Sequence, residues 1–252
     1  MAKQSGLGDG LLVDGYDLSG DIGSLSRIGG GLSGTQDVTG INKSAFERIG
    51  LARDGAIEYT AFFNDAAAAA HPVLSTLPTA DRILTYQRGV AAGSPAACLI
   101  GKQIGYDPTR GADGSLTIAV SAQANAFGIE WGIQATAGAV THTEADETAL
   151  IDLGGATSFG LQAYLHVTAF SGTDVTLTLQ GSEDDDGDPD TPANITGGGF
   201  SQITTAPQAQ RIQTGRTQAI EQYLRVASTT SAGFTSVSFV VVVVANTSSV
   251  VF

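Results

Sequence analysis

The sequence predicts a mainly β protein with two β domains, the first of which carries one helix. Three observations predict this class: apolar residues alternate with polar ones in short segments, glycine and aspartate separate those segments, and valine fills 240–244. With 252 residues, of which 42% are apolar, the chain is long enough to bury either one large core or two smaller ones.

The first half is expected to hold short strands and one helix. The strands are predicted at 11–13, 17–28, 45–49, 56–63, 83–88, 96–106, 115–124 and 128–134. The helix is predicted between Asn64 and Pro78, because Asn64 and Asp65 are capping residue types and alanine fills 66–70. Pro72 predicts a kink or a restarted turn near His71.

A glycine-rich segment, GGGLSGTQDVTG, occupies 29–40. Because it has no periodicity and glycine is conformationally free, we expect a mobile loop that becomes ordered only on contact with something else. Gly29, Gly31 and Gly34 fit the G-x-G-x-x-G pattern of nucleotide-binding loops, but the following TQDVTG is not helical in character. The match is therefore interpreted as chance.

The second half predicts four longer strands, at 159–170, 174–180, 221–228 and 235–246, which suggest an antiparallel sandwich. Consecutive valines in the last strand predict burial on both faces. We place the domain boundary at 142, within the polar stretch 139–148, giving domains 1–142 and 143–252. Their net charges are −4 and −9.

Charge and composition exclude several classes. A net charge of −13 argues against a protein that grips nucleic acid by neutralising phosphates. The first residues contain no apolar core of a signal peptide, so we expect synthesis in the host cytoplasm without one. The longest apolar run, 239–245, is too short to span a membrane. A lone Cys98 excludes an internal disulfide and any multi-cysteine zinc site.

No complete catalytic motif is present, and we expect no enzyme, no cofactor and no catalytic or metal-binding residue. His71, His142 and His166 are each interpreted as structural, and Trp131 on an alternating strand is expected in the core. The acidic run SEDDDGDPD at 182–190 could hold calcium, but it lacks the EF-hand spacing. A solvated hairpin turn is the favoured interpretation of this run.

Three motifs in the first half carry a resemblance: DVTG at Asp37–Gly40, GAIEYTAFFND at Gly55–Asp65, and QANAFGIEWG at Gln123–Gly132. Together with the strand order, they resemble the major tail (tail tube) proteins of long-tailed bacteriophages over roughly 10–137. The resemblance implies a tail-tube-like β-sandwich or half-barrel with one flanking helix, followed by a second antiparallel β-sandwich on the outside of the tube.

The resemblance also implies function: a structural virion protein of the tail whose homo-hexameric rings stack into a tube that conducts DNA. Implied partners are further copies of the chain, the tape measure protein, and tail terminator or tip proteins, with double-stranded DNA passing without sequence-specific binding. The implied inter-ring stacking loop comprises Gly29, Gly30, Gly31, Leu32, Ser33, Gly34, Thr35, Gln36, Asp37, Val38, Thr39 and Gly40.

A low number of basic residues suits a tube through which DNA must slide, because each contact between a basic side chain and a phosphate would increase the affinity of the tube for DNA. Two alternatives stay open. One is a capsid decoration or fibre-like virion protein, and the other is a calcium-dependent glycan-binding β-sandwich module.

Overall fold

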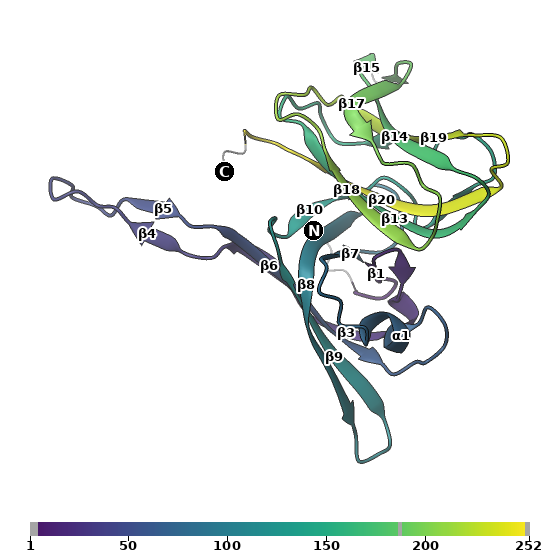
Figure 1. Ribbon diagram of the computed structural model, residues 1–252. Helices are drawn as coiled ribbons and strands as arrows, with labels where there is room; N and C mark the ends of the chain where they lie inside the picture. The colour runs from purple at the N-terminus through teal and green to yellow at the C-terminus, as the bar shows by residue number, and fades with distance from the viewer. Residues whose placement is uncertain (1–4, 186–187, 250–252) are drawn as a thin grey trace. The chain divides into compact units, whose positions relative to one another are not determined.

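A computed structural model describes residues 5–185 and 188–249, and these are nearly all β, as predicted (Figure 1). The chain forms two compact units. Unit 1 comprises residues 1–19, 85–98 and 131–252, and unit 2 comprises 20–84 and 99–130. Strands β7 (Arg82–Gln87) and β8 (Pro95–Arg110) contribute residues to both units. This division does not coincide with the boundary predicted at 142, which stays a prediction.

Unit 2 is built on an antiparallel sheet in the order β3 (Ile22–Leu32), β6 (Arg53–Phe62), β9 (Leu116–Ala124) and the part of β8 that belongs to unit 2, residues 99–110. Side chains alternate between its two faces. One face is buried and carries Ile57, Tyr59, Ile118 and Val120. Helix α1 (Ala70–Leu74) packs in this core through Val73 and Leu74, and its Leu74 carbonyl accepts a hydrogen bond from Gln103 of β8 at 2.7 Å.

The helix is shorter than the sequence predicted. It begins at Ala70, because Ala66–Ala69 form turns in which Ala68 has a φ of 63°. Asp21 binds both sides of this turn, accepting from the Ala70 amide at 2.9 Å and from the Asn64 side chain at 2.8 Å. Pro72 lies in the first turn, where its missing N–H is not needed, so the predicted kink does not arise.

Unit 1 contains a β-sandwich. One sheet has the order β18 (Gln208–Gln213), β13 (Leu161–Ser171), β20 (Ser236–Ala245) and β10 (Glu130–Gln134), and continues to β8, β7, β1 (Gly10–Val13) and β2 (Tyr16–Asp17). The other has the order β12 (Ile151–Asp152), β19 (Tyr223–Thr230), β14 (Val175–Ser182) and β17 (Ala193–Gly199). Leu165, Leu177, Val226 and Val241 are among the side chains that form the core between them.

Strand β20 confirms the interpretation of the valine run. Val241 and Val243 point into the sandwich core, whereas Val240 and Val242 on the opposite face are also buried. The other long strands predicted in the second half are present within a few residues, whereas the strand predicted at 17–28 is divided into β2, a 3-10 turn at Ser19–Asp21, and β3. The sequence does not predict strands β17 and β18, because ANITGGG alternates apolar and polar residues over four positions only and QAQRIQ contains two apolar residues three positions apart.

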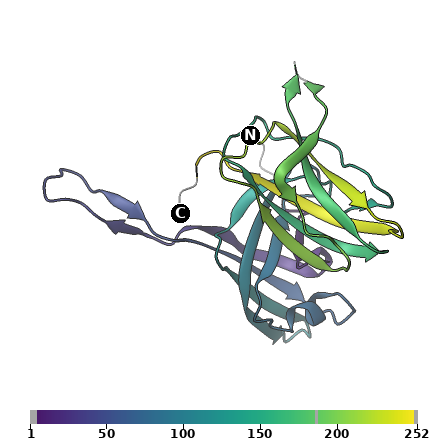
Figure 2. The same ribbon diagram turned by 45° about the horizontal axis from the view of Figure 1, so that its top comes forward.

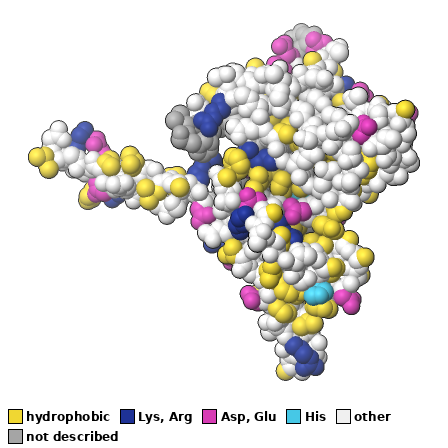
Figure 3. Space-filling view, viewed as in Figure 1, with side chains coloured by type: hydrophobic (Ala, Val, Ile, Leu, Met, Phe, Trp, Pro, Cys, Tyr) yellow, Lys and Arg dark blue, Asp and Glu magenta, His cyan; other side chains and the backbone are white. Residues whose placement is uncertain are grey.

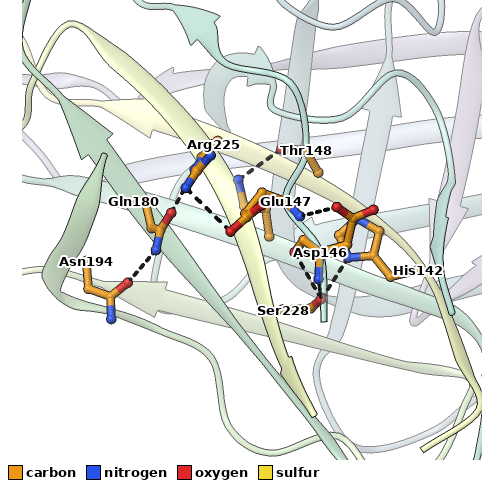
Figure 4. Close-up of polar contacts among 9 residues, drawn as sticks. His142, Asp146, Glu147, Thr148, Gln180, Asn194, Arg225 and Ser228 are labelled. Carbon is orange, nitrogen blue, oxygen red and sulfur yellow. Dashed lines mark hydrogen bonds and ion pairs between the residues drawn. The ribbon is translucent and has the colours of Figure 1, made fainter. Parts of the chain in front are cut away.

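A polar network ties the predicted boundary segment to the sandwich (Figure 4). His142, at the end of β11 (Val140–His142), shares a hydrogen bond with Ser228 of β19 at 2.9 Å. Thr148 accepts from the Val226 amide at 3.0 Å, and Glu147 lies 3.5 Å from Arg225. β11 itself pairs with β20. Residues on both sides of 142 therefore belong to one hydrogen-bonded sandwich.

Candidate functional site

The most distinctive feature of unit 2 is a long β-hairpin over residues 29–54, here called the arm. Gly29 and Gly30 of β3 pair with Ala56 and Gly55 of β6, and the same register continues past a bend at Ser33. There the Ser33 amide donates to the Ala52 carbonyl at 2.8 Å. The outer part consists of β4 (Thr35–Asp37) and β5 (Arg48–Gly50). Figures 1 and 2 both show the arm extending away from the rest of unit 2.

The loop expected at 29–40 instead contains the end of β3 and all of β4, while its mobility in the free subunit stays a prediction. A glycine-rich strand shows no alternation of apolar and polar side chains, because glycine has no side chain. Its backbone can nevertheless form the same hydrogen bonds as that of any other residue. At Gly30, a side chain would collide with the backbone of the partner strand, since an added Cβ would lie 2.3 Å from the Asp54 carbonyl oxygen. Glycine here permits close strand approach. Strand β4 was not predicted, and β5 overlaps the strand predicted at 45–49.

Local contacts order the tip of the arm. The Val38 amide donates to the Glu47 carbonyl at 2.9 Å, and the Glu47 amide donates to the Thr39 hydroxyl at 2.8 Å. Asp37 accepts from both the hydroxyl and the amide of Thr39, and these hydrogen bonds lower the pKa of its carboxyl. The Arg48 guanidinium lies over the Phe46 ring at 4.7 Å from its centroid.

Apolar side chains along the arm are exposed to solvent (Figure 3). Ile41 is fully exposed, Phe46 is 70% exposed and Leu32 is 58% exposed. Val38, Ile49 and Leu51 are exposed as well, and the pairing of β4 with β5 places these three on one face. Exposed apolar groups gathered on one element mark an interaction surface.

The arm carries no net charge within a chain of net charge −13. Its three acidic residues, Asp37, Glu47 and Asp54, are balanced by Lys43, Arg48 and Arg53. Lys43 and Glu47 form an ion pair at 2.9 Å. An uncharged arm can approach another acidic copy of the chain with little electrostatic repulsion.

Small and polar side chains cover part of the solvent-facing side of the unit 2 sheet, and Phe62 on the same side is 55% exposed. Glu58, Thr60, Ala119 and Ser121 line a shallow hollow of about 170 Å³ together with Asp107. The carboxylate of Glu58 lies 3.4 Å from a guanidinium nitrogen of Arg27, whose charge is thus offset. This face offers little attraction to a phosphate backbone.

At one end of the same sheet lies β3, which pairs with β6, whereas β8 at the other end also pairs with β7 and β10. Register shifts interrupt β3 between Ile22 and Ser24 and between Leu25 and Arg27. Bulges of this kind hinder non-specific pairing of an edge strand with strands of other molecules. From Ile28 onward the register is regular, so the backbone N–H and C=O groups on the free edge are evenly spaced. An edge strand of this type can pair with a strand from another chain.

The acidic run 182–190 forms a short hairpin. Strand β15 (Asp184–Asp185) pairs with β16 (Asp188–Pro189), while Asp186 and Gly187 lie outside the described residues. The Ser182 hydroxyl closes the base of the hairpin by donating to the Asp190 carbonyl at 2.7 Å. Within 5–185 and 188–249, no three His, Cys, Asp or Glu side chains gather as the ligands of a metal ion would.

His166 is fully buried in unit 1 and bonded at both ring nitrogens. The Gly15 amide donates to Nδ1 at 3.1 Å, so the ring proton sits on Nε2, which donates to the Thr85 hydroxyl at 2.8 Å. The Thr85 hydroxyl is then free to donate to the Cys98 sulfur at 3.3 Å. Burial lowers the pKa of His166 to about 3, so the imidazole stays neutral.

The other histidines also make structural contacts. His71 bonds the Tyr106 hydroxyl at 2.5 Å and stacks near Phe63. Burial lowers the pKa of His142, against the opposing influence of Asp146 and Glu147. Although His142 contacts Ser228, both are buried, and the Asp146 carboxylate accepts from the Glu147 amide rather than orienting the imidazole. This arrangement lacks the geometry of a Ser-His-Asp triad.

Trp131 is about half exposed, with its ring edge-on to Tyr86 at 6.3 Å, so the expectation of a core position was wrong. Gly29, Gly31 and Gly34 lie in or beside β3 of the arm, with no helix following them, so they do not form a nucleotide-binding turn. Among the described residues, no helix is long and apolar enough to cross a membrane.

Comparisons with known proteins give distant likenesses to solved structures. No protein-family model and no curated protein matches the chain. Among solved structures, the Dit protein of phage SPP1, described as a hub adsorption apparatus of phages that infect Gram-positive bacteria, is 12% identical. That likeness covers 92% of this chain and 98% of the SPP1 chain, with a TM-score of 0.30.

A protein of the phage p2 baseplate is 8% identical, with 92% and 97% of the two chains covered and a TM-score of 0.33. A chain of infectious bursal disease virus is 12% identical, with 94% of this chain and 56% of that chain covered and a TM-score of 0.20.

Proposed function

We propose that this protein is a structural subunit of a bacteriophage tail tube that assembles with copies of itself into stacked rings, and that the arm carries the contact between rings. The observation that carries the proposal is the arm itself: a hairpin paired along its length whose apolar side chains are left to solvent. A monomer gains nothing from exposing Ile41 and Phe46, whereas covering such a side chain contributes about 1.5–3 kcal/mol.

The sheet of unit 2 supports lateral closure into a ring. Among the described strands β3 pairs with β6 alone, so its other edge can pair with a strand of a neighbouring subunit in the ring. The exposed face carries Thr60, Ser121 and the offset pair Arg27–Glu58, which suits a bore through which DNA slides without being held. Tape measure, terminator and tip proteins are partners of the tube in this proposal, which places the chain in the virion tail and gives it no catalytic role.

Electron microscopy of the purified full-length chain, with sedimentation analysis, tests this proposal. We expect stacked tubes from the wild-type chain and at most single, unstacked rings from a variant carrying Ile41→Asp and Phe46→Asp, because charges placed at the tip oppose burial there. The variant should keep the wild-type circular dichroism spectrum, since both side chains are exposed.

Leu7→Asp is the matched control, because Leu7 is an equally exposed apolar residue of unit 1 outside the arm. It should assemble as the wild type does. A wild-type chain that stays monomeric at high concentration would count against the proposal, and so would tubes formed equally well by the tip variant.

A further inference from the structure

A hollow of about 580 Å³ lies at one end of the unit 1 sandwich, apart from the arm and the sheet of unit 2. Three segments enclose it: the turn 153–159 between β12 and β13, residues 219–221 before β19, and residues 245–247 at the end of β20. Its volume falls within the range of small-molecule sites.

Hydrogen bonds hold these three segments together. Thr157 exchanges backbone hydrogen bonds with Ile220 at 2.8 and 2.7 Å, and its hydroxyl donates to the Asn246 carbonyl at 2.5 Å. The Asn246 side chain donates to the Phe159 carbonyl at 2.9 Å. The walls are therefore fixed before any ligand arrives, which lowers the entropic cost of binding.

The lining combines an apolar side with a few polar groups. Phe159, Ala156, Ala219 and Ala245 supply apolar surface, and Ser158 and Thr247 supply hydroxyls. Gly154 and Gly155 have φ values of 79° and 154° with open space where a Cβ would stand, so they present bare backbone to the hollow.

Charge narrows the class of ligand. Glu221 is the one charged residue among the described residues that line the hollow, and no Lys, Arg or His is among them. A carboxylate only accepts hydrogen bonds, so it favours ligands that carry donors, such as the hydroxyl groups of a sugar. An anionic ligand would meet this carboxylate within a region, 143–252, of net charge −9.

From these observations we infer that the hollow is a binding site for a neutral sugar, with one face of the ring against Phe159 and its hydroxyls donating to Glu221. Aromatic rings provide apolar surface for such a ring face, and paired hydroxyls suit the two carboxylate oxygens. This inference does not depend on the proposed tube function, because the hollow lies wholly within unit 1.

Nuclear magnetic resonance titration of the labelled full-length chain tests the inference. The probes are the methyl glycosides of glucose, galactose and N-acetylglucosamine, with N-acetylneuraminic acid as an anionic probe. We expect saturable shifts confined to 153–159, 219–221 and 245–247 with at least one neutral glycoside, and none with the anionic sugar.

Glu221→Gln and Phe159→Ala should each weaken binding at least tenfold while leaving the remaining spectrum unchanged. Glu144→Gln, at an exposed carboxylate away from the hollow, should bind as the wild type does. The inference is overturned if no neutral glycoside shifts these resonances, if the anionic sugar binds equally well, or if both hollow variants bind normally.

Discussion

His166 is a buried imidazole whose neutrality is part of the stability of unit 1. The unfolded chain takes up a proton near pH 6.5, but the folded chain does so only near pH 3. Between these values the unfolded state binds more protons, so the free energy of unfolding falls as the pH falls, by up to about 1.4 kcal/mol per pH unit. His142 contributes in the same direction.

We therefore predict that His166→Gln flattens the dependence of unfolding free energy on pH between 6.5 and 5, as measured by urea denaturation. Thr85→Val is the control, since it removes the hydroxyl that accepts from Nε2 but leaves the imidazole in place. It should cost about 1–3 kcal/mol at every pH and keep the slope. Equal slopes in His166→Gln and wild type would show that this residue does not govern acid sensitivity.

At the scale of elements, the arm is an appendage of the unit 2 sheet. Leu32 stands opposite Arg53, so residues 33–52 can be replaced by Asn-Gly, which closes a two-residue hairpin in the same register. We predict that this shortened chain keeps its thermal midpoint within a few degrees and no longer forms tubes. The removed side chains are mostly exposed, and they contribute little to the fold. Loss of folding on thermal denaturation would mean that the arm stabilises the subunit itself.

Elements also differ in how far the sequence predicts them. The valine run predicted β20 and its double burial, because apolar side chains report directly on burial. The arm escaped prediction as a hairpin, since its regularity lies in backbone pairing between Gly29–Leu32 and residues far along the chain. The glycine content of residues 29–40 nevertheless marks this segment as unusual in the sequence. No sequence motif predicts the hollow near Phe159, because three segments that are far apart in the sequence form it.

At the scale of the whole molecule, a fragment can test whether a domain ends at residue 142, as the sequence predicts. β10 and β11 lie before this boundary, and both pair with β20 after it. Ala135 belongs to the core that β13, β14 and β20 build. We therefore expect a fragment of residues 1–142 to expose an unpaired edge and to aggregate, as followed by light scattering. A monodisperse fragment with cooperative unfolding would instead support the boundary at 142.

The central claim is that the arm becomes covered when copies of the chain assemble. Hydrogen exchange of the dispersed and the assembled chain, read by mass spectrometry, tests it most directly. Amides of the free arm are paired but surrounded by solvent, and such hairpins open at low cost. We predict that exchange across 32–51 slows at least tenfold on assembly, while exchange at the acidic hairpin 182–190 is unchanged. Unaltered exchange across 32–51 in assembled material would contradict the account.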